Sequence, residues 1–383
     1  MRNKIPKHWQ KSKFEDVLQY EQPSKYIVKS TEYGDDYKTP VLTAGKSFIL
    51  GYTDEKDGIF TDVPVIIFDD FTTDTKFVDF HFKVKSSAMK ILKPTRNTNI
   101  KFIFYLMQTI HHKSDTHKRY WISEYAKREI PLPPLDEQNL IVKKIESCFE
   151  KIDFAISNFK KSKELIEIYK QSVLSHAFNG KLTNSNLNSW QVKKLGEICE
   201  IKMGQSPEGK FVSDNLSNLK EALEFHQGKI YFSDKFILKS KFYTSEIKKV
   251  ADEKSILLCV RAPVGIVNIT DRKVAIGRGL CALKFKKDNN MFLYYFLINS
   301  KMYFETNSTG TTFQAINLNV VRNLEIPLPP LSEQNLIVSQ IEKRFKAADS
   351  ALNLIEQNLK KAEILKQSIL SKAFNGELVK DKK

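Results

Sequence analysis

Two short polar segments of this sequence have residue types that could do chemistry. Asp69 and Asp70 follow the apolar run VIIF and resemble a metal-binding carboxylate pair, but no Glu-x-Lys follows to complete a nuclease centre. Three histidines between 111 and 117 have no cysteine or paired carboxylate at metal-ligand spacing. We therefore expect a turn or base-contact role for the two aspartates, and no metal site.

The common catalytic motifs are missing. The sequence contains no P-loop, no HExxH zinc-protease motif and no GxSxG nucleophile motif. A methyltransferase would need a glycine-rich cofactor loop after a strand and an Asn/Asp-Pro-Pro-aromatic tetrapeptide; Gly277-Arg278-Gly279 is only a short GxG, and the tetrapeptide does not occur. The four cysteines are scattered without a CxxC pair, so we expect reduced, packed thiols. The expected role is binding, without a cofactor in this chain.

Residues that can address nucleic acid lie in two loops at matching positions. The loop 308–321 contains Thr311, Thr312, Gln314 and Asn317, and the loop 113–126, which lies 196 residues earlier, has different side chains at these places. Gln, Asn, Thr, Arg and Lys side chains can contact base edges and phosphates. Two loops of one architecture could therefore read different targets, although an ordinary surface loop remains the alternative for any single residue.

Each loop leads into a long repeat that must position it. Residues 129–182 and 325–378 align without a gap, and 30 of their 54 positions are identical. In each copy the double proline must precede a helix, Asp136 or Ser332 could be its N-cap, and Gly180 or Gly376 could end it. The repeat therefore predicts two long helices of about 40 residues, roughly 60 Å each.

The apolar residues of these helices recur at steps of four and three, which indicates a coiled-coil seam. A single thin helix cannot bury such a stripe, and the other copy is the nearest candidate partner. The predicted seam residues are Ile141, Ile145, Ile152, Phe159, Ile166 and Val173 in the first copy and Ile337, Ile341, Ile355, Leu365 and Ile369 in the second.

Two further blocks precede the helices, and both read as mixed α/β domains. Short β-branched runs alternate with glycine and polar turns, and each block has one apolar helix, at 100–110 and at 291–299. The fold class predicted is mixed α+β: two α/β domains joined and flanked by two long repeated helices that form a coiled coil. The predicted boundaries are 1–128, 129–183, 184–324 and 325–383.

The net charge of +16 is concentrated in the two blocks. Residues 1–128 carry an excess of +6 and residues 184–324 an excess of +8, whereas the two helical copies are close to neutral. A polyanion is the expected partner of the blocks, and the helices are the expected scaffold. An even spread would instead have indicated a generally lysine-rich composition. No apolar run is long enough to span a bilayer, so we expect a cytoplasmic protein without a membrane contact.

Several motifs together carry a resemblance over the whole chain. They are the duplicated IPLPPLxEQ start, the helix end AFNGxL, the Trp that opens each block, and GQSP (204–207), VRAPVG (260–265), IGRGL (276–280) and TGTTFQAIN (309–317). This combination is similar to the specificity subunit of type I restriction–modification systems. The first block has YKTPVLTAGK (37–46) and KVKSSAMKIL (83–92) in place of the GQSP and GRGL segments, so it resembles a target recognition domain less closely.

The resemblance implies a DNA-binding, non-catalytic subunit. Each block would be a target recognition domain for one half of a split, asymmetric site in double-stranded DNA. The two repeated helices would pair as an antiparallel coiled coil, set the spacer and dock two methyltransferase subunits. Restriction endonuclease/translocase subunits would join them. S-adenosylmethionine, ATP and Mg are expected in those partner subunits.

The residues predicted to contact DNA are the polar residues of the loops and motifs described above. They are Lys38, Lys46, Lys85, Ser86, Ser87, Lys118, Arg119 and Trp121 in the first block, and Gln205, Ser206, Arg261, Arg278, Thr311, Thr312, Gln314 and Asn317 in the second. Three alternatives stay open: a specificity subunit of a related bifunctional (type IIB/IIG-like) system, a polypeptide with its own methyltransferase activity, and a coiled-coil assembly protein with incidental basic charge.

Overall fold

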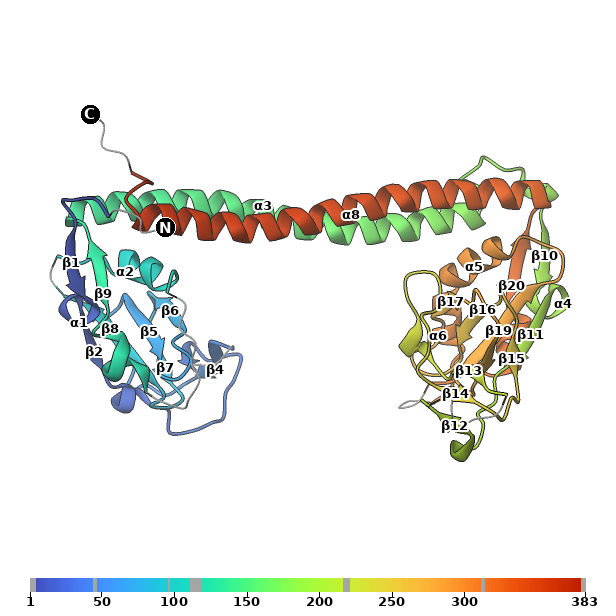
Figure 1. Cartoon of the computed structure of the whole chain (residues 1–383), viewed down its shortest axis with the longest axis horizontal. Coiled ribbons are helices and arrows are strands. Elements are labelled where there is room, and N and C mark those ends of the chain that lie inside the picture. Colours follow the sequence, from blue (N-terminus) through green and yellow to red (C-terminus); the bar gives the residue numbers. More distant parts are fainter. Residues whose placement is uncertain are drawn as a thin grey trace. The chain divides into compact units, whose positions relative to one another are not determined.

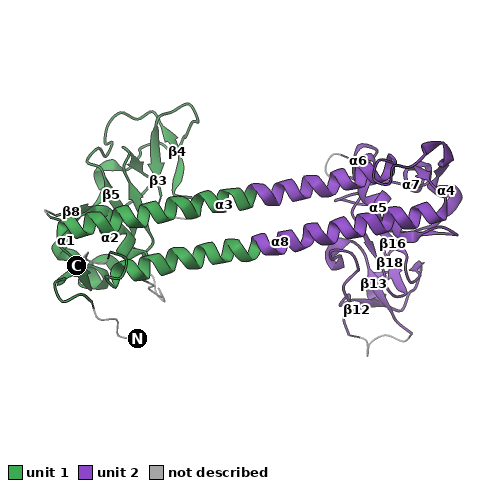
Figure 2. Ribbon diagram, turned by 90° about the horizontal axis from the view of Figure 1, so that it is seen from above, with its two compact units in different colours: residues 1–160, 356–383 green, residues 161–355 purple. Residues whose placement is uncertain are grey.

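A computed structural model describes residues 5–43, 47–95, 97–110, 119–215, 221–310 and 314–379. The chain forms two compact units (Figure 2): unit 1 is Met1–Lys160 with Glu356–Lys383, and unit 2 is Lys161–Ile355. Each unit combines one block with parts of both long helices. The four-segment division of the sequence stays a prediction, because the boundary between the units passes through both helices.

The first block of unit 1 is built on a four-stranded antiparallel sheet with the order β2-β8-β5-β6. A three-stranded sheet, β4-β3-β7, lies beside it, and its β3–β7 pair is parallel. The bounds are β1 (Gln10–Lys13), α1 (Phe14–Val17), β2 (Leu18–Glu21), β3 (Thr39–Leu42), β4 (Ile49–Thr53), β5 (Val65–Asp69), β6 (Thr75–Val78), β7 (Lys83–Val84), β8 (Met89–Pro94), α2 (Ile100–Met107) and β9 (Glu129–Leu132).

The second block, in unit 2, repeats this plan. Its antiparallel sheet has the order β11-β19-β16-β17, and a five-stranded sheet, β12-β14-β13-β18-β15, contains the parallel pair β13–β18. The bounds are β10 (Gln191–Lys194), α4 (Leu195–Ile198), β11 (Cys199–Met203), β12 (Val212–Ser213), β13 (Leu223–His226), β14 (Tyr243–Thr244), β15 (Val250–Ala251), β16 (Ile256–Cys259), β17 (Val267–Ile269), β18 (Val274–Ile276), β19 (Leu280–Phe285), α5 (Asn290–Asn299), α6 (Lys301–Thr306), α7 (Leu318–Asn323) and β20 (Glu325–Leu328).

The predicted mixed α+β class is confirmed, as are the two apolar helices, which are α2 and α5. The strand VIIF of the first block is β5, whose five residues are all buried. A two-stranded ladder ties each block to the start of its long helix, β1 with β9 and β10 with β20. The entrance and the exit of each block therefore lie side by side, which Figure 1 shows for both.

The two long helices are α3 (Leu135–Phe178) and α8 (Leu331–Phe374), each of 44 residues and about 66 Å long. They pack together in both units (Figure 1). Lys366 pairs with Asp153 in unit 1, and Lys170 pairs with Asp349 in unit 2. The start of one helix thus lies against the end of the other, so the predicted antiparallel pairing is confirmed.

The C-terminal ends of the two long helices agree with the prediction, and the N-caps do not. Gly180 and Gly376 follow the helices with φ of +76° and +73°, the left-handed conformation that glycine favours. The N-cap prediction is wrong, because the helices begin at Leu135 and Leu331, one residue before Asp136 and Ser332. The prolines immediately precede the first turn, so an acidic or hydroxyl side chain one position later lies inside the helix.

Most predicted seam residues are inside the helix packing. Ile141, Ile145, Ile152, Val173, Ile337, Ile341 and Ile355 are buried, and Phe159, Ile166 and Ile369 are half-buried. Leu365 is a correction, since its side chain is 50% exposed. The inward position belongs to its neighbour Lys366, whose Nζ lies 5.2 Å from the centroid of the Phe149 ring and pairs with Asp153. A lysine stem can cover apolar surface while its charge stays at the edge, and the sequence pattern could not distinguish this register.

The repeated Glu-Gln-Asn segment at the start of each long helix fixes the block on the helix. In unit 1, Glu137 accepts a hydrogen bond from the Trp9 indole at 3.0 Å, and Gln138 accepts one from the Asn99 backbone N–H at 2.8 Å. Asn139 accepts a third bond from the Asn99 side chain at 2.7 Å. Asn99 is also the N-cap of α2, so one short motif joins the opening Trp, the apolar helix and the long helix.

Unit 2 has the same three bonds. Glu333 accepts from the Trp190 indole at 3.1 Å, Gln334 from the Asn289 backbone N–H at 3.0 Å, and Asn335 from the Asn289 side chain at 2.6 Å. Asn289 caps α5. None of the helices in the described part of the chain is both long and apolar enough to cross a membrane.

Candidate nucleic-acid interface

Loops from five parts of the second block meet at one end of its strands. The Gly277 N–H donates to the His226 carbonyl at 2.8 Å, and the Val260 N–H donates to the Gly279 carbonyl at 2.9 Å. The Ile316 N–H in turn donates to the Val260 carbonyl at 3.0 Å, and the Gly204 N–H donates to the Leu280 carbonyl at 2.8 Å. We call the surface formed by 204–206, 227–229, 260–263, 277–279 and 314–317 the second platform.

Glycines allow these backbones to touch. A β-carbon at Gly204 would lie 2.1 Å from the Gly277 carbonyl oxygen, and one at Gly279 would lie 2.2 Å from the Gln227 carbonyl oxygen. Such distances are far inside van der Waals contact, so no other residue fits without moving the backbone. The GxG segment is therefore a packing device that turns Arg278 outward.

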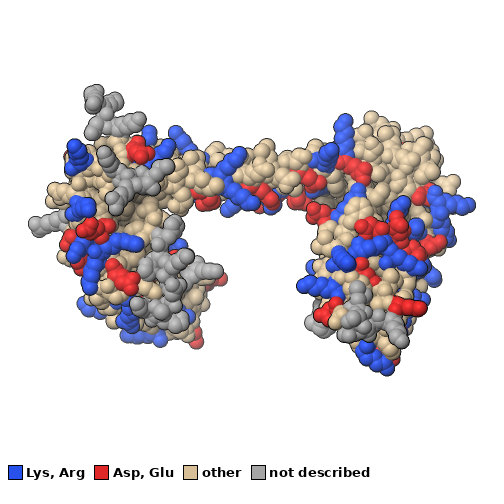
Figure 3. All heavy atoms as spheres, viewed as in Figure 1, with Lys and Arg blue, Asp and Glu red and all other residues tan. Residues whose placement is uncertain are grey.

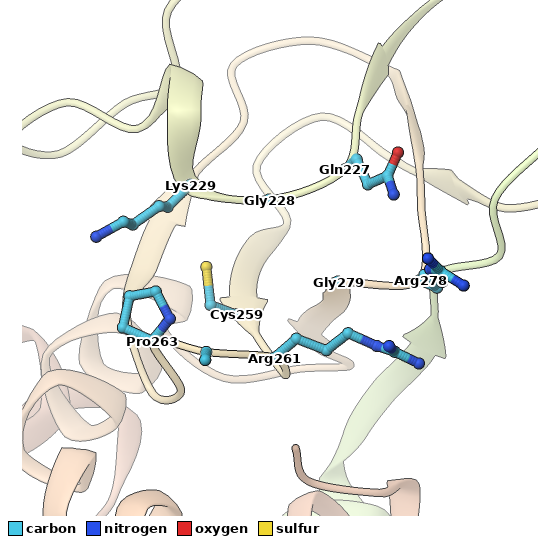
Figure 4. A pocket seen from close by; sticks show the side chains of 9 residues that line it. Gln227, Gly228, Lys229, Cys259, Arg261, Pro263, Arg278 and Gly279 are labelled. Carbon is cyan, nitrogen blue, oxygen red and sulfur yellow. The ribbon is translucent and has the colours of Figure 1, made fainter. Parts of the chain in front are cut away.

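A pocket of about 200 Å³ opens on this platform (Figure 4). Its wall includes three cationic side chains, Lys229, Arg261 and Arg278, and no acidic one. Figure 4 shows Gln227, Arg261 and Arg278 extending to one side of the pocket, with Lys229 pointing away on the other. Cys259 also lines the pocket, but burial raises the pKa of its thiol to about 12, so it is not a reactive thiolate.

The structure brings most of the second-block candidates onto this platform. Ser206 accepts a hydrogen bond from the Arg278 backbone N–H at 3.2 Å, and the Gln314 carbonyl accepts one from Ala262 at 3.0 Å. Gln205, Arg261, Arg278 and Gln314 are exposed. Among the described residues, neither Arg261 nor Arg278 is paired with a carboxylate. Thr311 and Thr312 lie outside the described residues.

Asn317 has a structural task in addition to its exposed position. Its side-chain oxygen accepts from the backbone N–H groups of Asn319 and Val320 at 2.9 and 3.1 Å, which makes it the N-cap of α7. Only its amide N–H₂ group is left for another partner. A change at Asn317 would therefore disturb α7 as well as any contact with nucleic acid.

A buried ionic network supports the strand that leads to the platform. Arg272 donates to both oxygens of Glu224, at 2.8 and 2.6 Å, and the His226 Nε2 lies 2.8 Å from one of them. Burial by itself would raise the pKa of the Glu224 carboxyl, but the bonds from Arg272, the Ser240 N–H and His226 lower it to about 2. Burial lowers the pKa of His226, against the opposing effect of Glu224.

The first block builds a surface of the same kind. The Lys85 N–H donates to the Leu42 carbonyl at 2.9 Å, the Asp70 N–H to the Ala88 carbonyl at 3.3 Å, and the Tyr120 N–H to the Asp70 carbonyl at 3.0 Å. These bonds correspond one by one to those of Gly277, Val260 and Ile316. We call the surface formed by Thr43, 85–88 and Arg119 the first platform; Asp70, Tyr120 and Trp121, which hold its loops together, are buried.

The first-block candidates divide into three groups. Lys85, Ser86, Ser87 and Arg119 are exposed on the first platform, and Lys38 is exposed beside β3. Lys46 and Lys118 lie outside the described residues, as do the three histidines at 111–117.

Trp121 requires a correction, because its side chain is only 1% exposed. Its ring packs against Phe14, Phe68 and Tyr125 with centroid separations of 6.5, 5.2 and 6.2 Å. The short helical turn Trp121–Tyr125 directs this ring into the core. It anchors the loop and cannot contact DNA without unpacking the cluster.

The paired aspartates have the predicted turn role. Asp69 accepts from the backbone N–H groups of Phe71 and Thr72 at 2.9 and 3.2 Å, and Asp70 accepts from the Trp121 N–H at 2.9 Å. The other Asp70 oxygen lies 3.3 Å from the buried Lys90 ammonium. Both carboxylates are thus engaged within the protein, and the described residues contain no group of three or more potential metal ligands.

Gln227 and Lys229 are platform residues that the sequence did not single out. They follow strand β13, and the signal that could have found them is the polar Gln-Gly-Lys segment directly after a short apolar strand. Figure 3 shows Lys and Arg side chains spread over the visible surface of both blocks, with Asp and Glu between them. Basic charge is therefore present on the visible face of each block.

Comparisons with known proteins agree on one family. The profile described as "Type I restriction modification DNA specificity domain" matches residues 6–166 and 188–364. The type I restriction enzyme EcoR124I/EcoR124II specificity subunit of Escherichia coli is 30% identical over 383 residues, covering 92% of this chain and 89% of that protein. The putative type I restriction enzyme MjaX specificity subunit of Methanocaldococcus jannaschii is 33% identical over 261 residues, covering 65% and 59%.

Two solved structures share the fold. A chain from a study of complex assembly and conformational transition in the type I restriction–modification system has a TM-score of 0.77 at 24% identity, covering 98% of this chain and 99% of its own. The HsdS subunit from Thermoanaerobacter tengcongensis has a TM-score of 0.62 at 24% identity with the same coverage. Both likenesses concern the fold: two β-rich domains with two long helices packed together.

Proposed function

This chain belongs to the type I restriction–modification DNA specificity family, and we propose that it selects the DNA sequence on which a type I complex acts. The family supplies the specificity part of such a complex and not its catalytic part. The observation that carries the proposal in this chain is the pair of platforms. Their backbone hydrogen bonds correspond, and their exposed side chains differ.

Each platform reads one half of a bipartite, asymmetric site. Phosphate contacts fix the register of a protein on DNA, and contacts to base edges specify the sequence. The first platform offers Lys85, Ser86, Ser87 and Arg119; the second offers Gln205, Arg261, Arg278 and Gln314. Because the two sets differ, the two half-sites differ, and the complete site is asymmetric.

The paired helices hold the two readers at a fixed spacing and dock two methyltransferase subunits. Large apolar side chains remain exposed at positions that repeat with the 196-residue offset. They are Leu140 and Leu336, Ile168 and Ile364, and Tyr169 and Leu365, all between 45% and 68% exposed. A repeated apolar surface on two repeated helices fits two copies of one partner. Restriction endonuclease/translocase subunits complete the complex, and the partners carry S-adenosylmethionine, ATP and Mg.

Sequencing of methylated bases in host DNA, with and without this gene, tests the proposal. The expected result is one split, asymmetric motif that is methylated only when the gene is present. No change in methylation when the gene is removed, in a host that carries the partner subunits, would contradict it. Binding to DNA should also weaken steeply as the salt concentration rises, because each phosphate contact releases counterions.

A second assay distinguishes the alternatives. The purified chain alone is incubated with DNA and a labelled methyl donor, and we expect no incorporation. Incorporation would favour a polypeptide with its own methyltransferase activity. DNA affinity that does not respond to salt, or to loss of the platform arginines, would favour a coiled-coil assembly protein. A related bifunctional system is distinguished by identifying the subunits that copurify with the chain.

A further inference from the structure

Gln227 and Arg278 are neighbours in space although 51 positions separate them in the sequence. The glycines on both sides of Arg278 touch Gln227: a β-carbon at Gly277 would lie 3.1 Å from the Gln227 Cγ, and one at Gly279 would lie 2.2 Å from its carbonyl oxygen. The two side chains therefore leave from backbones in direct contact (Figure 4).

The backbone under both residues is rigid. The residue before Gln227, His226, accepts the Gly277 N–H and is itself buried in the network with Glu224 and Arg272. The Ser206 hydroxyl holds the Arg278 N–H at 3.2 Å. A reader of base edges needs such a fixed base, because a side chain held in place gives up less conformational entropy when it binds.

Both side chains are exposed and free to contact a ligand. Within the part of the chain that the structure describes, the Gln227 amide has no hydrogen-bond partner and the Arg278 guanidinium has no carboxylate partner. Arg261 extends to the same side of the pocket as these two residues, and Lys229 lines its opposite side. The Gln227 amide offers a donor and an acceptor, and the Arg278 guanidinium offers two parallel donors, so both can pair with base edges. The positive charges of Lys229 and Arg261 suit contacts with the phosphate backbone.

We infer that Gln227 and Arg278 read neighbouring base pairs in the half-site of the second block. This rests on the proposed function and adds Gln227 as a specificity-determining residue. The Gln227 amide pairs with the N6 and N7 edge of an adenine, and the Arg278 guanidinium pairs with the O6 and N7 edge of a guanine. Lys229 and Arg261 contact phosphates on either side.

The first platform supports this reading by contrast. Thr43 follows β3 as Gln227 follows β13, because the residue before each accepts the corresponding backbone hydrogen bond. Ser86 and Ser87 take the place of Arg278 between the two backbone contacts. Thr43, Ser86 and Ser87 have short hydroxyl side chains, which extend less far than Gln or Arg and form different hydrogen bonds with base edges. The positions that correspond to Gln227 and Arg278 should therefore specify other bases in the half-site of the first block.

The test uses the full chain with its partner subunits in a host, and reads the methylated motif by sequencing. Gln227→Ala should lower discrimination at one base pair of one half-site by roughly 5- to 150-fold, the range typical of one bidentate base contact, and leave the other half unchanged. Gln227→Glu should move the preference at the same position from adenine toward cytosine, because a carboxylate only accepts hydrogen bonds. Gln191→Ala, an exposed glutamine on β10, is the matched control.

Arg278→Lys separates base reading from phosphate binding. Lysine keeps the charge but loses the fork, so a second position of the same half-site should relax. A normal motif for Arg278→Lys together with weaker overall methylation for Arg278→Ala would assign Arg278 to a phosphate. An unchanged motif for both Gln227 variants would overturn the role of Gln227. If the unaltered chain with its partner subunits produced no methylated motif at all, the proposed function itself would be contradicted.

Discussion

At the scale of single residues, the two platforms depend on residues that lie behind the exposed side chains. Gly279 lets the loop that carries Arg278 approach Gln227, and Trp121 anchors the first platform from inside the core. Glu224 holds Arg272 and His226 beneath the second platform. Residues that stabilise the blocks therefore lie next to the exposed residues that we propose contact DNA.

Gly279→Ala tests the close approach of two backbones. The new β-carbon would overlap the Gln227 carbonyl, so we expect a loss of about 1–3 kcal/mol in the free energy of unfolding, as for other overpacked sites. Chemical denaturation measures this loss. The control is Gly209→Ala, where a β-carbon would have no neighbour within 4 Å. Equal stability of the two variants would show that the loops can separate without cost.

Acid should weaken unit 2 through Glu224. Because its pKa in the folded chain is about 2 and its ordinary value is 4.5, its stabilisation is complete above pH 4.5 and is lost as the pH falls toward 2. The difference corresponds to about 3 kcal/mol. His226 acts in the same direction, since its lowered pKa makes protonation favour the unfolded chain below about pH 6.5.

Glu224→Gln should remove this dependence. At pH 7 we expect about 3 kcal/mol of destabilisation, because Arg272 loses its buried partner, and a flatter curve of unfolding free energy between pH 5 and 2. Thermal unfolding at a series of pH values checks both. Glu200→Gln, an exposed carboxylate on β11, should behave like the unaltered chain. The same acid sensitivity in Glu224→Gln would mean that other groups cause it.

At the scale of elements, the Glu-Gln-Asn segment connects each block to its long helix. Gln138 and Gln334 are buried, and each accepts from the N-cap backbone of the apolar helix while donating to a proline carbonyl at 2.9 Å. The sequence IPLPPLxEQN is therefore a joint, in which the prolines start the helix and the three polar residues orient the block.

Replacing either buried glutamine by alanine should loosen its own joint. Gln334→Ala leaves the Asn289 N–H and the Pro329 carbonyl without partners, which should cost about 1–3 kcal/mol in the free energy of unfolding. Hydrogen exchange at α5 should increase while α2 stays protected. Gln171→Ala, on the exposed side of α3, is the control. Increased exchange at α2 and α5 together would show that the two joints are not independent.

At the scale of the whole molecule, two repeated helices of equal length join two blocks that differ. The chain thereby resembles a dimer made within one polypeptide, and we propose that the repeated helices bind like partners while the differing blocks bind unlike half-sites. The ion pairs of Lys170 with Asp349 and of Lys366 with Asp153 are related by the 196-residue offset. They give one antiparallel register for both units.

Removing one heptad from each helix should shorten the spacer of the recognised site. The segments to remove are 158–164 of α3 and 355–361 of α8, seven residues from each helix, which shortens each helix by about 10 Å, or roughly 3 base pairs of DNA. Sequencing of methylated motifs checks the spacer. Removing 158–164 alone should instead break the pairing and abolish methylation. An unchanged spacer in the double deletion would show that the helices do not set it.

Much of the architecture could be predicted from the sequence. The starts and ends of α3 and α8, the two apolar helices and the β-rich character of the blocks depend on local signals: prolines, glycines and the period of apolar residues. The internal repeat predicted that the two helices pair with each other, because a thin amphipathic helix needs a partner, and the antiparallel direction came from the family resemblance. The concentration of charge in the blocks likewise required no three-dimensional information.

Only the tertiary structure decided which polar residues share a surface. Gln227 meets Arg278 because β13 and β18 pair in parallel, a contact between distant segments that no local pattern records. Trp121 and Leu365 were misplaced for the same reason. A residue's type and spacing show that it could contact a partner, but the direction of its side chain depends on what the rest of the chain packs against it.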